Sequence, residues 1–317
     1  MPYAIEATDL RKSFKGHQAV DGLHLRVEQG ELFALLGPNG AGKTTTVNIL
    51  STLLKPDGGT ARVAGYDAAK NAGEVRRRIS VTGQFAALDE GLSGLQNMML
   101  IARLQGYSAR EARSIAERLV HAFGLEEAKN RTVQHYSGGM RRRLDIAAGI
   151  VSRPEVLFLD EPTTGLDPES RLGIWESIRS LLKRGTTVLL TTQYLEEADR
   201  LADRVAVMDG GKIVAEGTPT ALKASIGGKT LKIRLENPSG LERVRRLLAD
   251  HLKLAAHPGD DPHDVRIPVT DAGLAGQAIH LLSSHNVALN DFGLDEPSLD
   301  EVFLSLTASR RSEEAFA

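Results

Sequence analysis

The residues of this sequence that are best suited to chemistry form a glycine-rich loop that ends in a lysine and a hydroxyl. The loop fits the phosphate-binding pattern G-x-x-x-x-G-K-[ST] at every position. Glycines let a main chain wrap closely around phosphate oxygens, Lys43 would reach the β- and γ-phosphates, and the Thr44 hydroxyl would bind Mg²⁺. The alternative is an ordinary glycine-rich turn. The members of the loop are Gly37, Pro38, Asn39, Gly40, Ala41, Gly42, Lys43 and Thr44.

The residues on either side of the loop favour a phosphate site over an ordinary turn. Before it, residues 31–36 end in a short apolar run that is typical of a buried parallel strand. After it, residues 44–54 place apolar side chains on one face of an expected helix. The loop would therefore open a helix, where main-chain N–H groups and the helix dipole attract an anion.

Two adjacent carboxylates form a second candidate group. Asp160 and Glu161 follow the fully apolar residues 156–159, which we expect to form a buried strand. Carboxylates at the tip of such a strand are costly unless a cation or hydrogen-bond donors neutralise them. Mg²⁺ carried by a nucleotide would do so for Asp160, and Glu161 would polarise a water molecule for in-line attack on the γ-phosphate. The alternative is that both carboxylates cap the next element.

Two glutamines and one Ser-Gly-Gly step mark further candidate positions. Gln84 and Gln193 each come just beyond an expected strand, and ligands of open α/β sheets lie outside the carboxyl ends of the strands. The Ser-Gly-Gly step opens a helix, so it is a second candidate anion site by the same dipole argument. The step consists of Ser137, Gly138 and Gly139.

The order of the expected elements indicates the fold class. Strands and helices alternate up to about residue 220, which predicts an α/β fold with a largely parallel sheet. Residues 93–152 are expected to be helical, with a capping box at Ser108 and Glu111 and a helix stop at Gly124.

A Gly-Gly break near residue 228 is the expected boundary between two domains, residues 1–220 and residues 229–317. The second domain follows a βαβαβα pattern, and a capping box at Ser298 and Glu301 opens its last helix. We expect a small α+β domain with a regulatory or dimer-stabilising role.

Composition sets limits on the class of protein. The chain has 317 residues, of which 41% are hydrophobic and 25% are charged, and its net charge is −2. This is an ordinary globular composition without a general attraction to nucleic acid. Cysteine is absent, which excludes disulfides and thiolate metal sites. Signal-peptide and bilayer-spanning patterns are not found, so we expect another chain to cross the membrane if the protein works at one.

Taken in order, these motifs resemble those of the ATP-binding subunits of ABC transporters. Residues 37–44 match the Walker A loop, Gln84 the Q-loop, residues 137–139 the signature sequence, residues 156–161 the Walker B strand with its catalytic glutamate, and residues 165–167 the D-loop. The match covers residues 4 to about 220. It implies a P-loop NTPase fold of the ABC type, with a mixed sheet core and a helical subdomain, and it implies ATP and Mg²⁺ as cofactors.

The resemblance also implies roles for individual residues. Phe14 would stack on adenine, Glu161 and Gln193 would act in catalysis, and Thr44, Gln84 and Asp160 would hold the metal. The residues implied in nucleotide binding are Phe14, Gly37, Pro38, Asn39, Gly40, Ala41, Gly42, Lys43, Thr44, Thr45, Gln84, Ser137, Gly138, Gly139 and Asp167.

Two departures from the commoner family pattern indicate which subfamily the sequence resembles. The signature begins with Tyr136 and ends with Met140 where leucine and glutamine are usual, and the usual switch histidine is Gln193. Both features, and the ending at residues 296–304, are similar to the daunorubicin/doxorubicin resistance subfamily of exporters. Glutamine cannot take up a proton near neutral pH, so Glu161 would do the base work or act by positioning.

The resemblance implies an ATP-hydrolysing motor that powers efflux of drugs or complex lipids through a separate integral-membrane permease. The subunit would lie peripherally at the cytoplasmic face of the cell membrane. Two copies would enclose ATP head to tail, so that Lys43, Thr44 and Gln84 of one copy face the Ser-Gly-Gly step of the other. No nucleic-acid partner is expected.

Two alternatives remain within the same superfamily. One is a soluble ABC-type ATPase in translation or DNA maintenance, and the single cassette without a long coiled-coil insertion argues against it. The other is an importer subunit, against which the variant signature and Gln193 argue.

Overall fold

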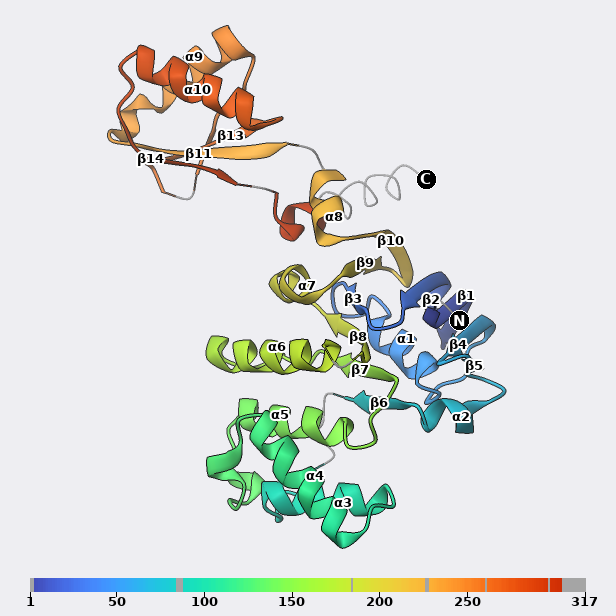
Figure 1. The fold of residues 1–317 in the computed structure, drawn as a ribbon. Coiled ribbons are helices and arrows are strands. Elements are labelled where there is room, and N and C mark those ends of the chain that lie inside the picture. The colour runs from blue at the N-terminus through green and yellow to red at the C-terminus, as the bar shows by residue number, and fades with distance from the viewer. Residues whose placement is uncertain are drawn as a thin grey trace. The chain divides into compact units, whose positions relative to one another are not determined.

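The computed structural model describes residues 3–83, 88–183, 185–225, 228–259, 261–295 and 297–303. Gln84, one of the predicted site residues, lies outside these ranges. The chain forms two compact units, Met1–Pro219 and Thr220–Ala317, and Figure 1 shows their helices and strands. Each unit has a hydrophobic core that contains residues of that unit alone.

A six-stranded sheet forms the centre of the first unit. Its order is β10-β9-β3-β8-β7-β6, and all neighbouring strands are parallel except β9 and β10. The largely parallel sheet predicted from the alternation is therefore confirmed. Every residue of β3, β7 and β8 is buried, which explains their continuous apolar and β-branched runs. The strands are β3 (Leu32–Leu36), β6 (Ile79–Thr82), β7 (Val156–Asp160), β8 (Thr187–Thr192), β9 (Arg204–Asp209) and β10 (Lys212–Gly217).

An antiparallel sheet in the order β2-β1-β4-β5 completes the mixed architecture. Helix α1 (Lys43–Leu50) shares one core with strands of both sheets. The predicted end of this helix at residue 54 is wrong, because Thr52 has a φ of +68° and Leu53 is 67% exposed. The remaining elements of this part are β1 (Tyr3–Phe14), β2 (His17–Glu28), β4 (Gly58–Val63), β5 (Tyr66–Asp67) and α2 (Ala72–Arg76).

A helical part follows β6 in the chain and has its own apolar cluster with the neighbouring strands. Both serines that open its first two helices form capping boxes, Ser93 with Gln96 and Ser108 with Glu111. The stop predicted at Gly124 is also observed, since this residue has a φ of +64° and follows the helix end. The helices of this part are α3 (Gly94–Leu104), α4 (Ala109–Ala122) and α5 (Gly138–Gly149), with 3₁₀ turns at Glu126–Ala128 and Val133–His135. Two further helices follow strands of the central sheet, α6 (Pro168–Leu182) after β7 and α7 (Leu195–Leu201) after β8.

The second unit is an α+β fold with an antiparallel sheet in the order β12-β13-β11-β14. Helices α9 and α10 bury Val244, Leu248, Ala278 and Leu282 in one cluster with the sheet, so both helices cover the same face. The short strand β12 is not anticipated by the βαβαβα pattern. Bounds are α8 (Pro219–Ser225), β11 (Lys229–Leu235), α9 (Leu241–Leu252), β12 (His257–Pro258), β13 (Asp264–Val269), α10 (Ala272–Ser284) and β14 (Leu289–Asp295).

Candidate functional site

The predicted phosphate loop connects β3 to α1 and begins where the parallel strands end. Gly42 stands at the N-cap of α1 with a φ of +101°, and a Cβ there would lie 2.2 Å from the carbonyl oxygen of Ala19. A Cβ on Gly37 would lie 2.3 Å from the carbonyl oxygen of Met208. The loop therefore needs glycine at both positions for space, and at Gly42 also for its backbone conformation.

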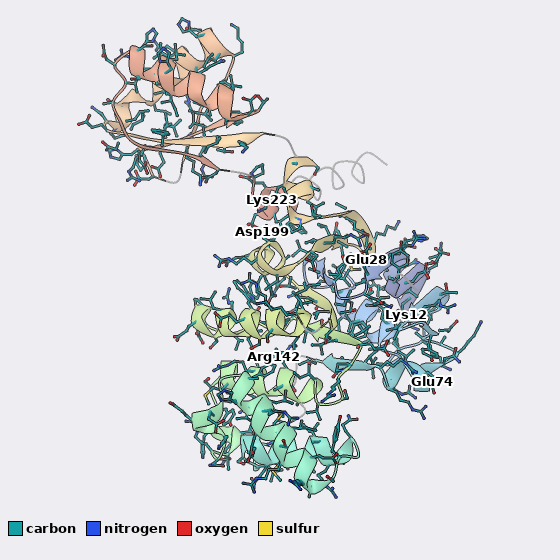
Figure 2. The ribbon with its side chains drawn as sticks, in the orientation of Figure 1. Lys12, Glu28, Glu74, Arg142, Asp199 and Lys223 are labelled. Atoms are coloured by element: carbon teal, nitrogen blue, oxygen red, sulfur yellow. The ribbon has the colours of Figure 1, made fainter. Side chains whose placement is uncertain are left out.

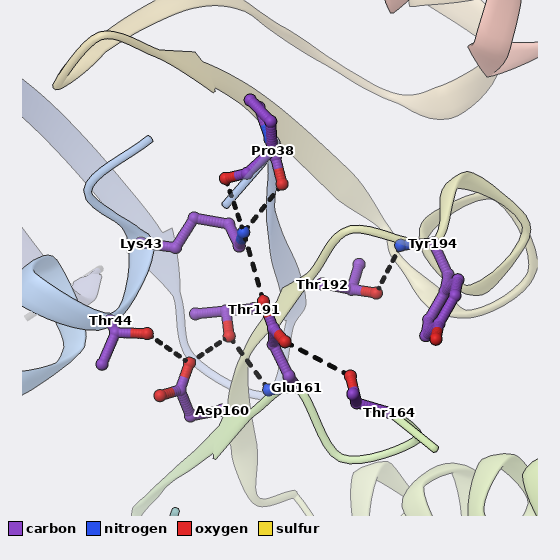
Figure 3. A network of polar contacts seen from close by, with 10 residues as sticks. Pro38, Lys43, Thr44, Asp160, Glu161, Thr164, Thr191, Thr192 and Tyr194 are labelled. Atoms are coloured by element: carbon purple, nitrogen blue, oxygen red, sulfur yellow. Dashed lines mark hydrogen bonds and ion pairs between the residues drawn. The ribbon is translucent and has the colours of Figure 1, made fainter. Parts of the chain in front are cut away.

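Lys43 lies at the centre of a buried polar network (Figure 3). Its ammonium donates to the carbonyl oxygens of Gly37 at 2.7 Å and Pro38 at 3.1 Å. It also forms an ion pair with Glu161 at 3.3 Å, in which both side chains are less than a tenth exposed. The structure thus brings the predicted phosphate-binding lysine and the predicted catalytic glutamate into contact.

Asp160 ends β7 and is buried, as the sequence predicts for a carboxylate at a strand tip. Its Oδ1 accepts a hydrogen bond from the Thr44 hydroxyl at 3.2 Å and a short one from the Thr191 hydroxyl (Figure 3). One carboxylate and one hydroxyl from two different elements are oxygen ligands of the kind that Mg²⁺ uses beside nucleotide phosphates. No cluster of three or more His, Cys, Asp or Glu side chains suited to a metal is found among the described residues.

Glu161 has a backbone conformation that is uncommon for a residue with a side chain, with a φ of +47°. Its N–H is held by Thr191, whose carbonyl and hydroxyl oxygens both accept from it at 3.1 and 3.0 Å. Its Oε2 accepts from the Thr164 hydroxyl at 3.2 Å. These contacts do not support the alternative that both carboxylates serve only as caps, because Asp167, not Glu161, caps the next helix.

Gln193 follows β8 directly and is half-buried. Since β8 lies between β3 and β7, the chain after it begins at the same edge of the sheet as the phosphate loop and the carboxylate pair. The neighbouring turn is fixed by Tyr194, whose N–H donates to the Thr192 hydroxyl at 2.9 Å. Tyr194 and Thr192 appear with the network in Figure 3.

The Ser-Gly-Gly step opens α5 as the sequence predicts. Ser137 is the N-cap, and its hydroxyl accepts from the N–H of Met140 at 3.2 Å. Gly139 packs closely on α6, since a Cβ there would lie 2.3 Å from the Ser170 hydroxyl. Asp167 caps α6 through Ser170, and hydrogen bonds from that residue lower the pKa of the Asp167 carboxyl.

Gly138 and Glu161 line one open groove of about 590 Å³ between the start of α5 and the turn before α6. The groove runs past Pro162, residues 164–166 and Arg141. The predicted signature step and the predicted catalytic glutamate therefore border the same space. Phe14 ends β1 with 46% of its surface exposed, so its ring is accessible for stacking.

Three residues near the site are not singled out by the sequence. Thr191 bonds to both Asp160 and Glu161. Glu197 of α7 is fully buried and accepts from the Trp175 indole N–H at 3.1 Å, and its burial raises the pKa of its carboxyl. Arg142 of α5 is buried as well. Only the apolar surroundings of Thr191 and the position of Glu197 in the helix that follows Gln193 could have pointed to the first two.

The fold and the site together define the class, which is a P-loop ATPase of the ABC type. The family model described as "ABC transporter" matches residues 20–164, and the model described as "ATP-binding protein DrrA1-3-like, C-terminal domain" matches residues 217–307. Among solved structures, cbiO1 from Clostridium perfringens, part of the ABC transporter complex cbiONQ, superposes with a TM-score of 0.66 at 25% identity over 80% of this chain and 97% of that chain.

Curated relatives extend over nearly the whole chain. The daunorubicin/doxorubicin resistance ATP-binding protein DrrA of Streptomyces peucetius is 51% identical over 98% of this chain and 96% of its own length. The doxorubicin resistance ATP-binding protein DrrA of Mycobacterium tuberculosis is 46% identical over 96% of this chain and 93% of its own length. The chain belongs to the ABC transporter family, and within it to the DrrA-like ATP-binding proteins. It is an ATPase subunit of an ABC exporter, and the alternative of a soluble ATPase in translation or DNA maintenance finds no support.

Proposed function

We propose that the DrrA-like ATPase holds ATP with the residues named from the sequence. The phosphate loop and Thr45 would enclose the phosphates, Phe14 would stack on adenine, and Gln84 would complete the metal shell. The observation that carries this proposal is the contact of Lys43 with Glu161 at the carboxyl edge of the sheet, beside Asp160. In-line attack on a γ-phosphate needs a positioned water and a cation near the phosphate oxygens. Glu161 is of the type that positions a water, Asp160 is of the type that holds a metal cation, and Lys43 is itself a cation.

Mg²⁺ fits the residues at this edge. Thr44 and Asp160 would hold it, and when bound it neutralises charge that develops on the transferred phosphoryl group. Glu161 would orient the attacking water and accept its proton. Gln193 would donate a neutral hydrogen bond to the γ-phosphate, since a glutamine amide cannot carry the proton that a histidine could.

A second copy of the chain would complete each site. The start of α5 is solvent-exposed at Ser137 and Gly138, so its N–H groups are accessible to an anion carried by another copy. Enclosing the γ-phosphate from two sides would exclude water and strengthen every electrostatic contact there. Asp167, in the turn next to α5, would contribute to the same contact.

Export requires a pathway across the membrane, and no helix among the described residues is long and apolar enough to provide one. We propose that a separate permease supplies it and that the subunit lies at the cytoplasmic face of the membrane. The relatives' names mention daunorubicin and doxorubicin, so drugs of that kind are the cargo we propose. Complex lipids, which the resemblance in sequence implies as well, are the other candidate. Residues 1–220 would form the motor, and residues 229–317 would regulate it or stabilise its dimer.

The test is hydrolysis by purified protein and by two variants. Wild type should split ATP, Lys43→Ala should lose ATP binding, and Ser137→Trp should bind ATP but split it at least about tenfold more slowly, because a bulky group blocks the second half of the site. Ser114→Trp is the matched control, since it places the same bulky group on the exposed surface of α4, and it should split ATP as fast as wild type. Equal turnover by wild type and Ser137→Trp would refute the two-copy site.

Cargo and permease are tested in cells. Co-expression with a membrane protein encoded by the adjacent open reading frame should lower drug accumulation, and affinity purification of the ATPase should recover a hydrophobic partner. Recovery of RNA or ribosomes instead would contradict the exporter assignment. Unchanged drug accumulation together with a recovered permease would reject drugs as the cargo while leaving the export function in place.

A further inference from the structure

Arg142 lies in α5, five residues after the Ser137 cap, and it is only 9% exposed. Figure 2 labels it where the helical part meets the rest of the first unit. Its two neighbours differ from it. Arg141 forms an ion pair with Glu90 at the surface, and Arg143 donates to the carbonyl oxygen of Phe123 within the helical part.

The guanidinium of Arg142 binds three main-chain carbonyls of the proposed catalytic site. Nη1 donates to Gly83 at 2.5 Å, Nη2 donates to Asp160 at 3.1 Å, and Nε donates to Pro162 at 3.0 Å. Gly83 is the residue before Gln84, and Pro162 is the residue after Glu161. One rigid, planar side chain therefore holds the main chain at Gly83 and on both sides of Glu161.

The surroundings of Arg142 explain how its charge can be buried. Asp145, one turn further along α5, accepts from Nη1 at 3.2 Å. Burial lowers the pKa of Arg142, and the negative charges of Asp145, Asp160 and Glu197 oppose that shift. A buried arginine is destabilising unless its donors are satisfied. The three carbonyls meet this need. The buried charge is therefore satisfied only while α5 keeps its position relative to Gly83, Asp160 and Pro162.

We propose that Arg142 is a positioning residue that ties the start of α5 to the metal- and water-binding edge of the same chain. The inference rests on the proposed roles of Gln84, Asp160 and Glu161. When Ser137 contacts the γ-phosphate of an ATP molecule bound to the second copy, that contact would set the position of α5 as a whole. Through the guanidinium, that contact reaches the carbonyls beside Gln84 and Glu161, and so hydrolysis in one site depends on how the same chain engages the other.

The experiment compares Arg142→Gln and Arg142→Lys with Arg143→Gln as a matched control. Arg143 also donates to a main-chain carbonyl from the same helix, but that carbonyl belongs to Phe123, which carries no proposed catalytic role. Thermal unfolding confirms that each variant is folded. A fluorescent ATP analogue is titrated against each variant, first in the presence of EDTA and then in the presence of Mg²⁺. The values of kcat and KM for ATP hydrolysis are measured separately.

Arg142→Gln should bind the analogue in EDTA within about twofold of wild type, because it does not touch the phosphate loop. The tightening that Mg²⁺ adds should fall several-fold, and kcat should fall on the order of 100-fold, as expected for a misplaced catalytic group. Arg142→Lys keeps the charge but not the planar guanidinium, so it should show the same losses to a smaller degree. If Arg142→Gln does not fold, the lysine variant alone tests the positioning role. Arg143→Gln should behave as wild type.

Two outcomes would overturn the inference. One is a folded Arg142 variant with kcat and Mg²⁺ dependence within about threefold of wild type, well short of the loss expected for a misplaced catalytic group. The other is an equal loss of affinity with and without Mg²⁺, which indicates general distortion. The proposed function fails separately, if wild type does not hydrolyse ATP or if Lys43→Ala hydrolyses it as fast as wild type.

Discussion

Replacing Glu161 by glutamine should tighten ATP binding as well as abolish turnover. The reason is the ion pair between Lys43 and Glu161, whose side chains are 4% and 7% exposed. The same ammonium also donates to the carbonyl oxygens of Gly37 and Pro38. An ammonium has three donor positions, so a phosphate that binds Lys43 must compete with these three acceptors. Of the three, only Glu161 carries a negative charge.

The structure sets the size of this competition. Two unit charges 3.3 Å apart attract each other by about 5 kcal/mol at an effective dielectric constant of about 20. Desolvation of both charges offsets most of that attraction in a buried pair. We therefore expect Glu161 to oppose phosphate binding by about 1–2 kcal/mol, which corresponds to about 5- to 30-fold tighter binding of ATP by Glu161→Gln.

The assay is a fluorescence titration of ATP in EDTA, followed by a hydrolysis assay with Mg²⁺. Glu31→Gln is the matched control, because Glu31 is also buried, has a cationic partner in Arg204 at 3.4 Å, and lies at the opposite end of β3 from the phosphate loop. Its ATP affinity should equal that of wild type. If Glu161→Gln binds ATP no more tightly than wild type, the argument from the ion pair is refuted, and substantial turnover by this variant would remove Glu161 from its catalytic role.

Three further predictions test the surroundings of the site. Gly42→Ala should abolish ATP binding, as judged by the same titration, because its Cβ would meet the carbonyl oxygen of Ala19 at 2.2 Å. Gly94→Ala should lower the unfolding free energy by about 2 kcal/mol, since its Cβ would lie 2.1 Å from the Tyr136 hydroxyl, and Tyr136→Leu should relieve that loss in a double-mutant cycle. Burial raises the pKa of Glu197, so the folded chain holds this proton more tightly than the unfolded chain does. Wild type should therefore lose stability relative to Glu197→Gln as the pH rises above 4.5, as denaturant titrations from about pH 4 to about pH 8 can measure.

The parts of the structure that could be predicted are those whose causes are local or strongly periodic. The phosphate loop is recognisable because its glycines and Lys43 have a fixed spacing between a strand and a helix. The pair Asp160 and Glu161 could be placed at the edge of the sheet because the preceding strand is wholly apolar and parallel strands end together. Capping boxes such as that of Ser108 and Glu111 depend only on four residues and were predicted for the same reason.

The parts that could not be predicted depend on contacts between segments that are distant in the sequence. The end of α1 is an example, because Leu53 continues the apolar pattern but finds no core and stays exposed. Strand β12 is another, since two residues suffice to pair with β13 only once that strand is in place. The ion pair of Lys43 with Glu161 joins motifs that are far apart in the chain, and neither motif by itself indicates that the two side chains meet.

Three consecutive arginines in α5 show where the limit lies. Successive residues of a helix point about 100° apart, so a basic run must face several directions, but the sequence does not say which member faces inward. Arg141 and Arg143 are partly exposed, whereas Arg142 is buried. Burial of that side chain is stable because the main-chain carbonyls at positions 83, 160 and 162 accept hydrogen bonds from it. Position 160 is a proposed site residue, and positions 83 and 162 each adjoin one. We therefore expect catalytic geometry to depend on a contact that the sequence does not indicate. The Arg142 variants test that dependence directly.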